Sequence, residues 1–328
     1  MKKIRIYVLL TVAVTMLILL ILTFFVCQYS MRAENHVRYV GIMNVVSEKI
    51  AKTINGMEMN AMNVFDEVEK NMGSPESVID ALMSKTSLNP DVRGYFAAFE
   101  PDYFPQKGRW FEPYVHQTDS SNTFVMSQVG SARHDYTKSD WYVHAKEESM
   151  SFWSDPYYYY DGTSISGHYC TFVEPIFDSN GKLVCVCGAD MTLEWLSKEL
   201  RQIDYRSKQD ALLNKYTINK ELDYYTVVVN SDGSCIAHPE DKNVPMKEVV
   251  NDLKQRRSGM LETTVNGEPV TIYYGPISNI NWSVAVVVPQ QDTLKPMIIL
   301  SLILIAVVIL GLIVVWLVLR SARYAEVS

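Results

Sequence analysis

The sequence predicts an α+β fold in which a long N-terminal helix leads into two tandem antiparallel-sheet modules, flanked by two transmembrane helices. Three observations predict this fold. Two uncharged apolar stretches lie near the ends of the 328-residue chain, an apolar stripe at helical spacing follows the first, and β-rich segments with turn-forming residues fill the rest. A polar segment of about 270 residues therefore lies between two membrane spans.

The apolar stretches at 7–27 and 297–319 contain no charged residue. Each has about 20 residues, the length at which a helix crosses a hydrocarbon layer roughly 30 Å thick. We assign the transmembrane helices to 7–27 and 296–319. A cleaved signal peptide is the alternative for the first stretch, but the apolar run is too long and no small-x-small cleavage site follows it.

Basic residues flank both spans on the side away from the polar segment: Lys2, Lys3, Arg5, Arg320 and Arg323. Basic flanks of membrane helices stay in the cytoplasm. We therefore expect a two-pass protein of the plasma (inner) membrane, with the N-terminus at 1–6 and the tail at 320–328 in the cytoplasm. The large middle segment is then extracytoplasmic.

The extracytoplasmic segment is acidic, with 25 basic and 36 acidic residues and a net charge of −11. An acidic surface repels phosphate backbones, so nucleic acid is not an expected partner. The chain also has 20 Tyr and six Trp, a content suited to binding small molecules, although these residues also pack ordinary cores.

The five cysteines do not form the pattern of a disulfide framework. Cys185 and Cys187 would share one face of a strand and could not bridge each other. A bridge from Cys170 to Cys187 or to Cys235 stays open as an alternative, and buried free thiols are favoured. The sequence has no C-x-x-C, and its six His lack metal-ligand spacing, so we expect no metal and no cofactor.

A long stalk helix is expected over 28–72, because apolar residues recur three and four apart and no proline interrupts them. At about 1.5 Å per residue it would be about 60 Å long. The helix would pack on its own domain, and part of the stripe would also pair with a second copy of the chain; the two are compatible. The stripe consists of Met43, Val46, Ile50, Ile54, Met57, Ala61, Val64 and Val68.

The membrane-distal module is assigned to 73–215. A Pro- and aromatic-rich loop is expected over 102–122, and a hairpin with strands at 168–177 and 182–191 flanks the turn-forming sequence Asp178-Ser179-Asn180-Gly181. The other expected elements are helices at 76–85, 141–148 and 193–215 and strands at 93–99 and 124–129.

The membrane-proximal module is assigned to 216–295. Its strand at 269–276 ends in Pro276-Ile277 and is followed by a turn and an apolar strand, as Pro175-Ile176 is in the distal module. The same order of strand, Pro-Ile, turn and apolar strand therefore occurs twice, which indicates tandem copies of an α+β module. The expected elements are strands at 225–230, 234–238, 260–265, 269–276 and 282–288 and a helix at 246–255.

Several short motifs lie in order along the polar segment. They are Asp140-Trp141-Tyr142-x-x-Ala145, Trp153-Ser154-Asp155-Pro156-Tyr157-Tyr158, Pro175-Ile176 with Gly181, Gly188-Ala189-Asp190, Gly233 with His238-Pro239, Trp282, and Val288-Pro289. Their order and spacing resemble the double Cache (dCache) sensor domains of bacterial transmembrane receptors. The resemblance covers about residues 29–295. It implies PAS-like sheets and a ligand pocket in the distal module.

The resemblance also implies which residues contact a ligand. Related domains that bind amino acids or amines use an Arg two residues before a Trp for the carboxylate, then a Tyr and an Asp, and a later Asp for the ammonium. Trp141, Tyr157 and Asp190 occupy the Trp, Tyr and later Asp positions. The Arg position is Ser139 and the intermediate Asp position is Tyr159, so two polar anchors depart from the pattern.

The candidate ligand-binding residues are Trp141, Tyr157, Tyr159, Asp161, Asp190 and Lys138. The aromatic side chains would offer cation–π faces, the two carboxylates would hold an ammonium, and Lys138 would hold a carboxylate as a point charge. Two alternatives stay open: Trp141 as a core residue, and Asp190 as the cap of the helix that follows it. Alternate residues of an extended segment face opposite ways, so at most two of the tyrosines at 157–160 face one pocket.

The leading hypothesis is a transmembrane sensory receptor, expected as a homodimer, that binds a small amine, amino acid or carboxylate and signals through the second membrane helix. Only nine residues follow that helix, so the output (kinase, cyclase, SpoIIE-type phosphatase or chemotaxis-like) would lie beyond this sequence or on a cytoplasmic partner. A membrane-anchored extracytoplasmic enzyme and a ligand-binding scaffold are the alternatives. The sequence has no G-x-S-x-G, H-E-x-x-H or Walker loop, so we expect no enzyme and no catalytic residue.

Overall fold

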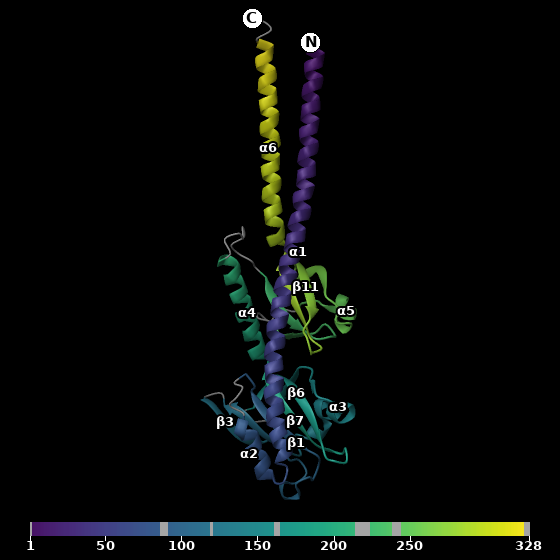
Figure 1. Cartoon of the computed structure of the whole chain (residues 1–328), viewed down its shortest axis with the longest axis vertical. Coiled ribbons are helices and arrows are strands. Elements are labelled where there is room, and N and C mark those ends of the chain that lie inside the picture. Colours follow the sequence, from purple (N-terminus) through teal and green to yellow (C-terminus); the bar gives the residue numbers. More distant parts are fainter. Residues whose placement is uncertain are drawn as a thin grey trace.

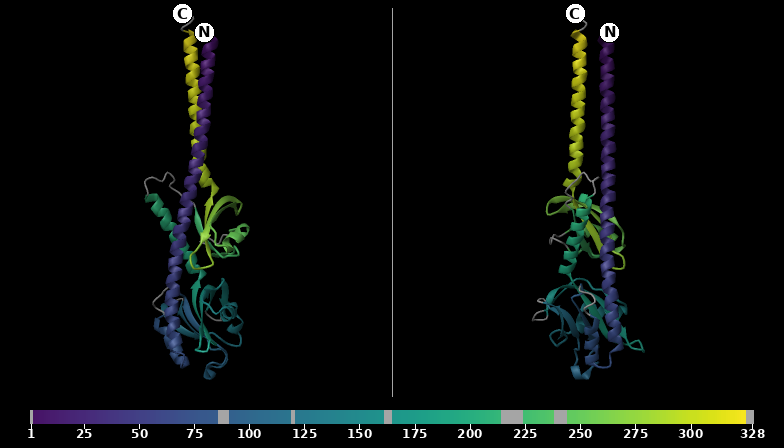
Figure 2. Two further views of the ribbon diagram at one scale, coloured as in Figure 1. Left: turned by 45° about the vertical axis from the view of Figure 1, so that its right-hand side comes forward. Right: turned by 60° about the vertical axis from the view of Figure 1, so that its left-hand side comes forward.

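The computed structural model describes residues 2–85, 91–118, 121–160, 165–213, 224–237 and 244–324. The molecule is elongated (Figure 1), with the two terminal helices side by side at one end and two sheet modules following one another along the first helix. The two further views in Figure 2 show the same arrangement, with both termini at the end far from the sheets.

The first helix, α1 (Lys2–Lys70), is continuous through the expected span at 7–27 and the expected stalk at 28–72. The last helix is α6 (Gln290–Tyr324). Among the described residues, these two helices are long and apolar enough to cross a membrane, within Leu10–Lys70 and at Met297–Val318. The apolar side chains at 10–26 and at 298–318 are largely exposed, as contact with lipid requires.

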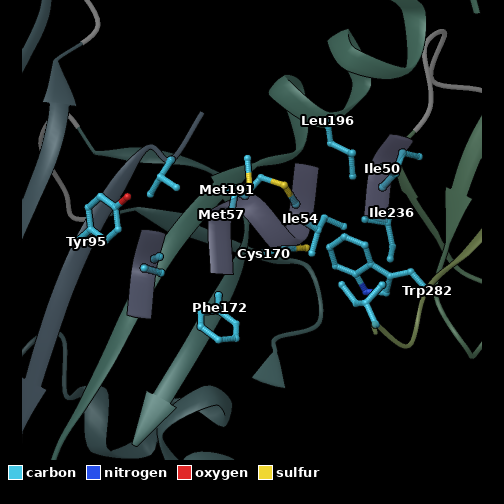
Figure 3. Packing of buried hydrophobic residues seen from close by; sticks show 14 of the residues in the cluster. Ile50, Ile54, Met57, Tyr95, Cys170, Phe172, Met191, Leu196, Ile236 and Trp282 are labelled. Carbon is cyan, nitrogen blue, oxygen red and sulfur yellow. The ribbon is translucent and has the colours of Figure 1, made fainter. Parts of the chain in front are cut away.

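The apolar stripe of α1 is buried along its whole length, from Met43 to Val68, which confirms the helical spacing seen in the sequence. The helix contacts strands of both sheets, so a single rigid element joins the modules. Figure 3 shows Ile50, Ile54 and Met57 of this helix within one cluster that also contains Phe172 and Trp282.

The distal module contains a seven-stranded antiparallel sheet in the order β3-β2-β1-β7-β6-β4, with β5 also paired to β6, among the described residues. Two helices accompany it, α2 (Pro75–Lys85) and α3 (Asp140–Glu148). The strands are β1 (Gly94–Phe99), β2 (Pro113–Thr118), β3 (Ser121–Gln128), β4 (Phe152–Trp153), β5 (Tyr157–Tyr160), β6 (Ser166–Phe177) and β7 (Leu183–Thr192).

The expected loop at 102–122 is wrong in its second half, because β2 and the start of β3 lie there. Local sequence favours a loop, since Pro105 and Pro113 cannot donate a backbone hydrogen bond to a sheet. The strand forms because both of its edges pair, with Tyr95 opposite Val115 on one side and Met126 opposite Val115 on the other. Pairing with partners distant in sequence has overridden the local preference.

The proximal module contains a five-stranded sheet in the order β10-β11-β12-β8-β9, again counted over the described part of the chain. The helix α4 (Leu193–Leu213) connects the modules, and the helix expected at 246–255 is a 3-10 turn (Lys247–Val249) followed by the short α5 (Val250–Lys254). The strands are β8 (Tyr225–Val229), β9 (Cys235–Ala237), β10 (Gly259–Val265), β11 (Glu268–Pro276) and β12 (Ser283–Pro289).

The repeated plan is confirmed, because β6 pairs antiparallel with β7 and β11 pairs antiparallel with β12. In the proximal module the turn between β10 and β11 places Asn266 and Gly267 at φ 53° and 84°. Consecutive positive φ values define the two-residue hairpin turn that Asn-Gly favours.

The two faces of the distal sheet pack against different parts of the molecule. Alternation along β6 and β7 sends Cys170, Phe172 and Cys187 toward the cluster that contains α1. It sends Val173 and Val186 into a separate cluster with residues of α3. We call the α3 side the outer face. The five cysteines carry free thiols.

Candidate ligand-binding site

The outer face of the distal sheet is covered by aromatic side chains rather than by a long helix. Phe96 of β1 lies against Trp141 of α3, with ring centroids 4.9 Å apart. Two glycines make room for aromatic rings on this face, Gly188 for Phe96 and Gly94 for Tyr114. A Cβ on Gly188 would lie 2.1 Å from the ring of Phe96, and a Cβ on Gly94 would lie 2.6 Å from the ring of Tyr114.

Asp190 of β7 lies on this face and is only 7% exposed. Thr171 donates a hydrogen bond from Oγ1 to Oδ1 of Asp190 (2.6 Å), and the Tyr157 hydroxyl lies 3.4 Å from the same oxygen. Burial raises the pKa of Asp190 to about 6, although the neighbouring hydroxyls of Thr171, Tyr114 and Tyr157 oppose the rise. Three hydroxyls therefore surround a buried carboxyl group.

Glu112 lies immediately before β2 and is 3% exposed. Burial raises the pKa of this carboxyl well above its ordinary value, and the charge of Asp190 raises it further. Its Oε2 makes no hydrogen bond within the described part of the chain. Nε2 of His134 lies 3.5 Å from that oxygen, but burial lowers the pKa of His134, so this imidazole is a poor counter-charge near neutral pH.

Tyr114 of β2 completes the polar group. Its ring stacks on His116, with centroids 5.0 Å apart, and the side chain is buried. Burial raises the pKa of its phenol well above the ordinary value, and the charge of Asp190 adds to the rise. The hydroxyl lies next to Asp190 yet makes no well-formed hydrogen bond in the described chain.

Four of the residues expected at the site lie around this face: Trp141, Tyr157, Tyr159 and Asp190. Trp141 is buried against Phe96, and the ring of Tyr159 lies 5.0 Å from that of His134. Tyr158 and Tyr160 are 61% and 58% exposed, so the degree of burial alternates along 157–160.

The other two expected residues are placed differently. The side chain of Lys138 is 80% exposed, and its Nζ lies 3.1 Å from Oδ2 of Asp135, so its ammonium is paired at the surface. Asp161 lies outside the described residues. Glu112 and Tyr114 were missed by sequence reasoning because they lie in the stretch that was expected to be a loop.

A groove of about 1540 Å³ runs along α3 and the β4–β5 segment and reaches α1 and the proximal module. Trp141 and all four tyrosines at 157–160 line it, together with Trp282 from the turn between β11 and β12. Its charged lining is acidic, and no Lys or Arg lines it among the described residues. The acidic residues are Glu58, Asp140, Glu147, Glu148 and Asp155.

Two hydrogen bonds cross the groove near the β4–β5 segment. The indole nitrogen of Trp153 donates to Oε1 of Glu58 on α1 (2.7 Å), and Nδ2 of Asn230 donates to Oδ1 of Asp155 (2.7 Å). The ring of Trp153 also lies 5.9 Å from that of Trp282. The segment beside the buried carboxyls is therefore tied to the long helix and to the proximal module.

Residues 78–198 match a protein family described as methyl-accepting chemotaxis protein-like, first PDC sensor domain. This stretch contains the distal sheet, α3 and every described residue of the site named above except Glu58, Asn230 and Trp282. The chain therefore has a double Cache fold, and its distal module is similar to a PDC sensor domain. Among curated proteins, no sequence matches the chain.

Solved structures share this double Cache fold over most of the chain. The extracellular domain of the proposed histidine kinase mmHK1S-Z3 has a TM-score of 0.64 at 19% identity, covering 80% of this chain and 96% of its own. The ligand-binding domain of Pseudomonas fluorescens chemoreceptor CtaA, in complex with L-isoleucine, has a TM-score of 0.57 at 17% identity, covering 82% and 98%. The ligand-binding domain of Mlp24 with asparagine has a TM-score of 0.55 at 14% identity, covering 82% and 98%.

Proposed function

We propose that this chain is a transmembrane sensory receptor whose distal Cache module binds a small organic amine outside the membrane. The observation that carries this proposal is Asp190, a buried carboxyl group surrounded by hydroxyls on the face covered by α3. A buried carboxylate without a cationic partner is costly, and an ammonium group supplies that partner through charge-assisted hydrogen bonds.

An amine fits the site better than a carboxylate. Ser139 stands where related domains place an Arg for a ligand carboxylate, and Lys138 is paired with Asp135 at the surface. The CtaA and Mlp24 domains were solved with L-isoleucine and asparagine, whose ammonium groups are of the kind that Asp190 would bind. Trp141 and Tyr157 would add aromatic faces, which attract cations.

Hydrogen bonds and the chain itself connect Asp190 to the β4–β5 segment, and that segment to α1 and the proximal module. Thr171 bonds Asp190 through its side chain, and its backbone N–H donates to Oγ of Ser154 (3.0 Å). Ser154 lies between Trp153 and Asp155, which are tied to α1 and to the proximal module. Ligand binding would therefore shift the β4–β5 segment and the elements that lead to the membrane. A ligand biases such a shift only by binding the two states with different affinity.

The receptor would be a homodimer with both termini in the cytoplasm. Residues 73–215 would bind the ligand, residues 216–295 would couple it to the second membrane helix, and a cytoplasmic output domain or partner would receive the signal. Basic residues next to both spans support this orientation. An enzyme would instead convert the bound amine, and a scaffold would bind it without a change in the membrane helices.

The test uses the full chain in lipid nanodiscs, with thermal unfolding measured in the presence of amino acids, monoamines, diamines and carboxylates. A bound amine should raise the unfolding temperature by mass action. Asp190→Asn should lower the affinity roughly tenfold to a hundredfold, because it removes a charge-assisted hydrogen bond. Glu248→Gln, at an exposed carboxyl of the proximal module, is the matched control.

Two results would contradict the proposal. One is an amine response that Asp190→Asn leaves intact, which would place the site elsewhere. The other is a response confined to carboxylates without an amino group. Conversion of the bound compound into a product would favour the enzyme.

A further inference from the structure

We propose that the ligand of the distal site is a linear diamine, with one ammonium held by Asp190 and the other by Glu112. This inference rests on the proposed function and narrows its ligand class. The Glu112 anchor lies outside the residues that the dCache resemblance indicates, and it is a feature of this chain's own structure.

The two carboxyl groups lie on the same face of the sheet. Gly94 of β1 is opposite Asp190 on one side, and Phe96 is opposite Tyr114 on the other. Glu112 precedes Tyr114 by two residues, and side chains alternate along a strand, so Glu112 and Tyr114 belong to the face that carries Asp190. The charge of Asp190 raises the pKa of Glu112, as expected for neighbouring acids.

Hydrogen-bonding capacity at this face is left unused. Oε2 of Glu112 and the hydroxyl of Tyr114 are buried and make no hydrogen bond within the described residues. An unmade hydrogen bond at a buried polar group costs about 1–3 kcal/mol. A second ammonium group brings three N–H donors, so it would satisfy Glu112 while the first satisfies Asp190.

Among the described residues, no Lys or Arg neutralises these carboxyls, and burial lowers the pKa of His134, the imidazole beside Glu112. Neither the pKa of Asp190 nor that of Glu112 is lowered by a Lys or Arg. Lys138 is paired with Asp135, and Arg93 lies beside the hydroxyl of Tyr169. Two like charges in one buried site do not ionise together unless cations arrive, so the site favours a ligand that carries two.

The apolar part of a diamine also finds matching surfaces. Phe96, Trp141 and the ring of Tyr157 lie on this face and belong to the same cluster of apolar side chains. Methylene groups of a linear diamine would pack against these rings while its ends reach the carboxyls. An amino acid would instead bring its carboxylate close to Glu112, which like-charge repulsion disfavours.

Diamine binding should release a proton, because Glu112 must give up its proton to hold an ammonium. The affinity should therefore rise as pH increases, and more steeply for a diamine than for a monoamine, because the diamine requires both carboxyl groups to be ionised. The titratable groups that face Glu112 are Asp190 on β7, His134 before α3, Tyr114 on β2, Tyr157 on β5 and Tyr136 just before α3.

The experiment is titration calorimetry on the full chain in nanodiscs with putrescine, cadaverine, butylamine and N-acetylputrescine. We expect the better diamine to bind roughly tenfold more tightly than either monocation, with proton release that shows as a buffer-dependent heat. Glu112→Gln should bring the affinity of the diamine down to about that of butylamine. Glu174→Gln is the matched control, because Glu174 is a partly buried acid of raised pKa on the opposite face of the same sheet.

Equal affinities for diamines and monoamines in the unaltered chain would overturn the inference, and this comparison needs no variant to fold. A diamine preference that persists in Glu112→Gln would overturn it too. So would tighter binding of an amino acid, which would leave the proposed amine receptor standing. Failure of every amine to bind would remove both proposals.

Discussion

Asn230 donates a hydrogen bond from Nδ2 to Oδ1 of Asp155 over 2.7 Å, and this contact joins the two Cache modules. Asp155 lies between β4 and β5, next to the site, whereas Asn230 follows β8 of the proximal sheet. Asn230 is buried and Asp155 is exposed, so the bond lies at the rim of the groove between the modules.

A double-mutant cycle with Asp155→Ala and Asn230→Ala tests whether this bond couples the modules. We expect a coupling free energy of about 1 kcal/mol, the net value of one hydrogen bond at a partly exposed position. The measurement is denaturant unfolding of the full chain in detergent for the two single variants and the double variant. Additive effects would show that the contact contributes no coupling.

Gly188→Ala should weaken ligand binding without touching the ligand directly. An added Cβ would lie 2.1 Å from Phe96, so the ring must leave its present position against Trp141. We expect a stability loss of about 1–3 kcal/mol and a clear drop in amine affinity. The control is Gly73→Ala, where no atom lies within 4 Å of the added Cβ. Unchanged affinity in Gly188→Ala would show that the Phe96 ring does not bound the site.

Asp204 of α4 holds the connecting helix to the proximal sheet. Its carboxylate accepts hydrogen bonds from the backbone N–H of Thr226 (2.8 Å) and from the Thr226 hydroxyl (2.5 Å). Asp204→Ala leaves two buried donors unpaired, so we expect a loss of about 2 kcal/mol in the free energy of unfolding. Asp204→Asn keeps one acceptor oxygen and should lose less. Equal losses in the two variants would contradict this account of the contact.

The sequence was sufficient for elements whose signals are local. The hairpin of β6 and β7 was predicted because an Asp-Ser-Asn-Gly turn separates two apolar runs, and α1 because its apolar residues repeat every three or four positions. The strand β2 was not predicted, because it is stabilised by pairing with β1 and β3 and not by a signal in its own sequence.

The same limit applies to the site. Asp190, Trp141 and Tyr157 were found because their motif resembles that of known sensor domains, and the structure gathers them on one face. Glu112 carries no motif, and an acid in a Pro- and aromatic-rich stretch of an acidic domain is not distinctive. Only the register of β2 against β1 brings it to the face that holds Asp190.

The stability of the unliganded chain should fall as pH rises, and Asp190 should account for part of the fall. Its folded-state pKa is about 6, above the ordinary value of 3.8, so between these values the folded chain binds more protons than the unfolded chain. The contribution of protonated Asp190 to the free energy of unfolding is therefore complete below about pH 4, and it is lost as pH rises through about 6. A difference of about two pKa units corresponds to about 3 kcal/mol.

Asp190→Asn should flatten this dependence, because the amide does not titrate. Asp204 also has a folded-state pKa of about 6, raised mainly by burial, so a shallower fall should persist in the variant. The measurement is thermal unfolding of the full chain in detergent at several pH values between about 4 and about 8, with Glu248→Gln as the control. Addition of a bound amine should stabilise the unaltered chain most at the upper end of this range, since binding favours the ionised carboxylate. Identical pH dependence in the unaltered chain and in Asp190→Asn would show that Asp190 is not the buried titrating group that the site requires.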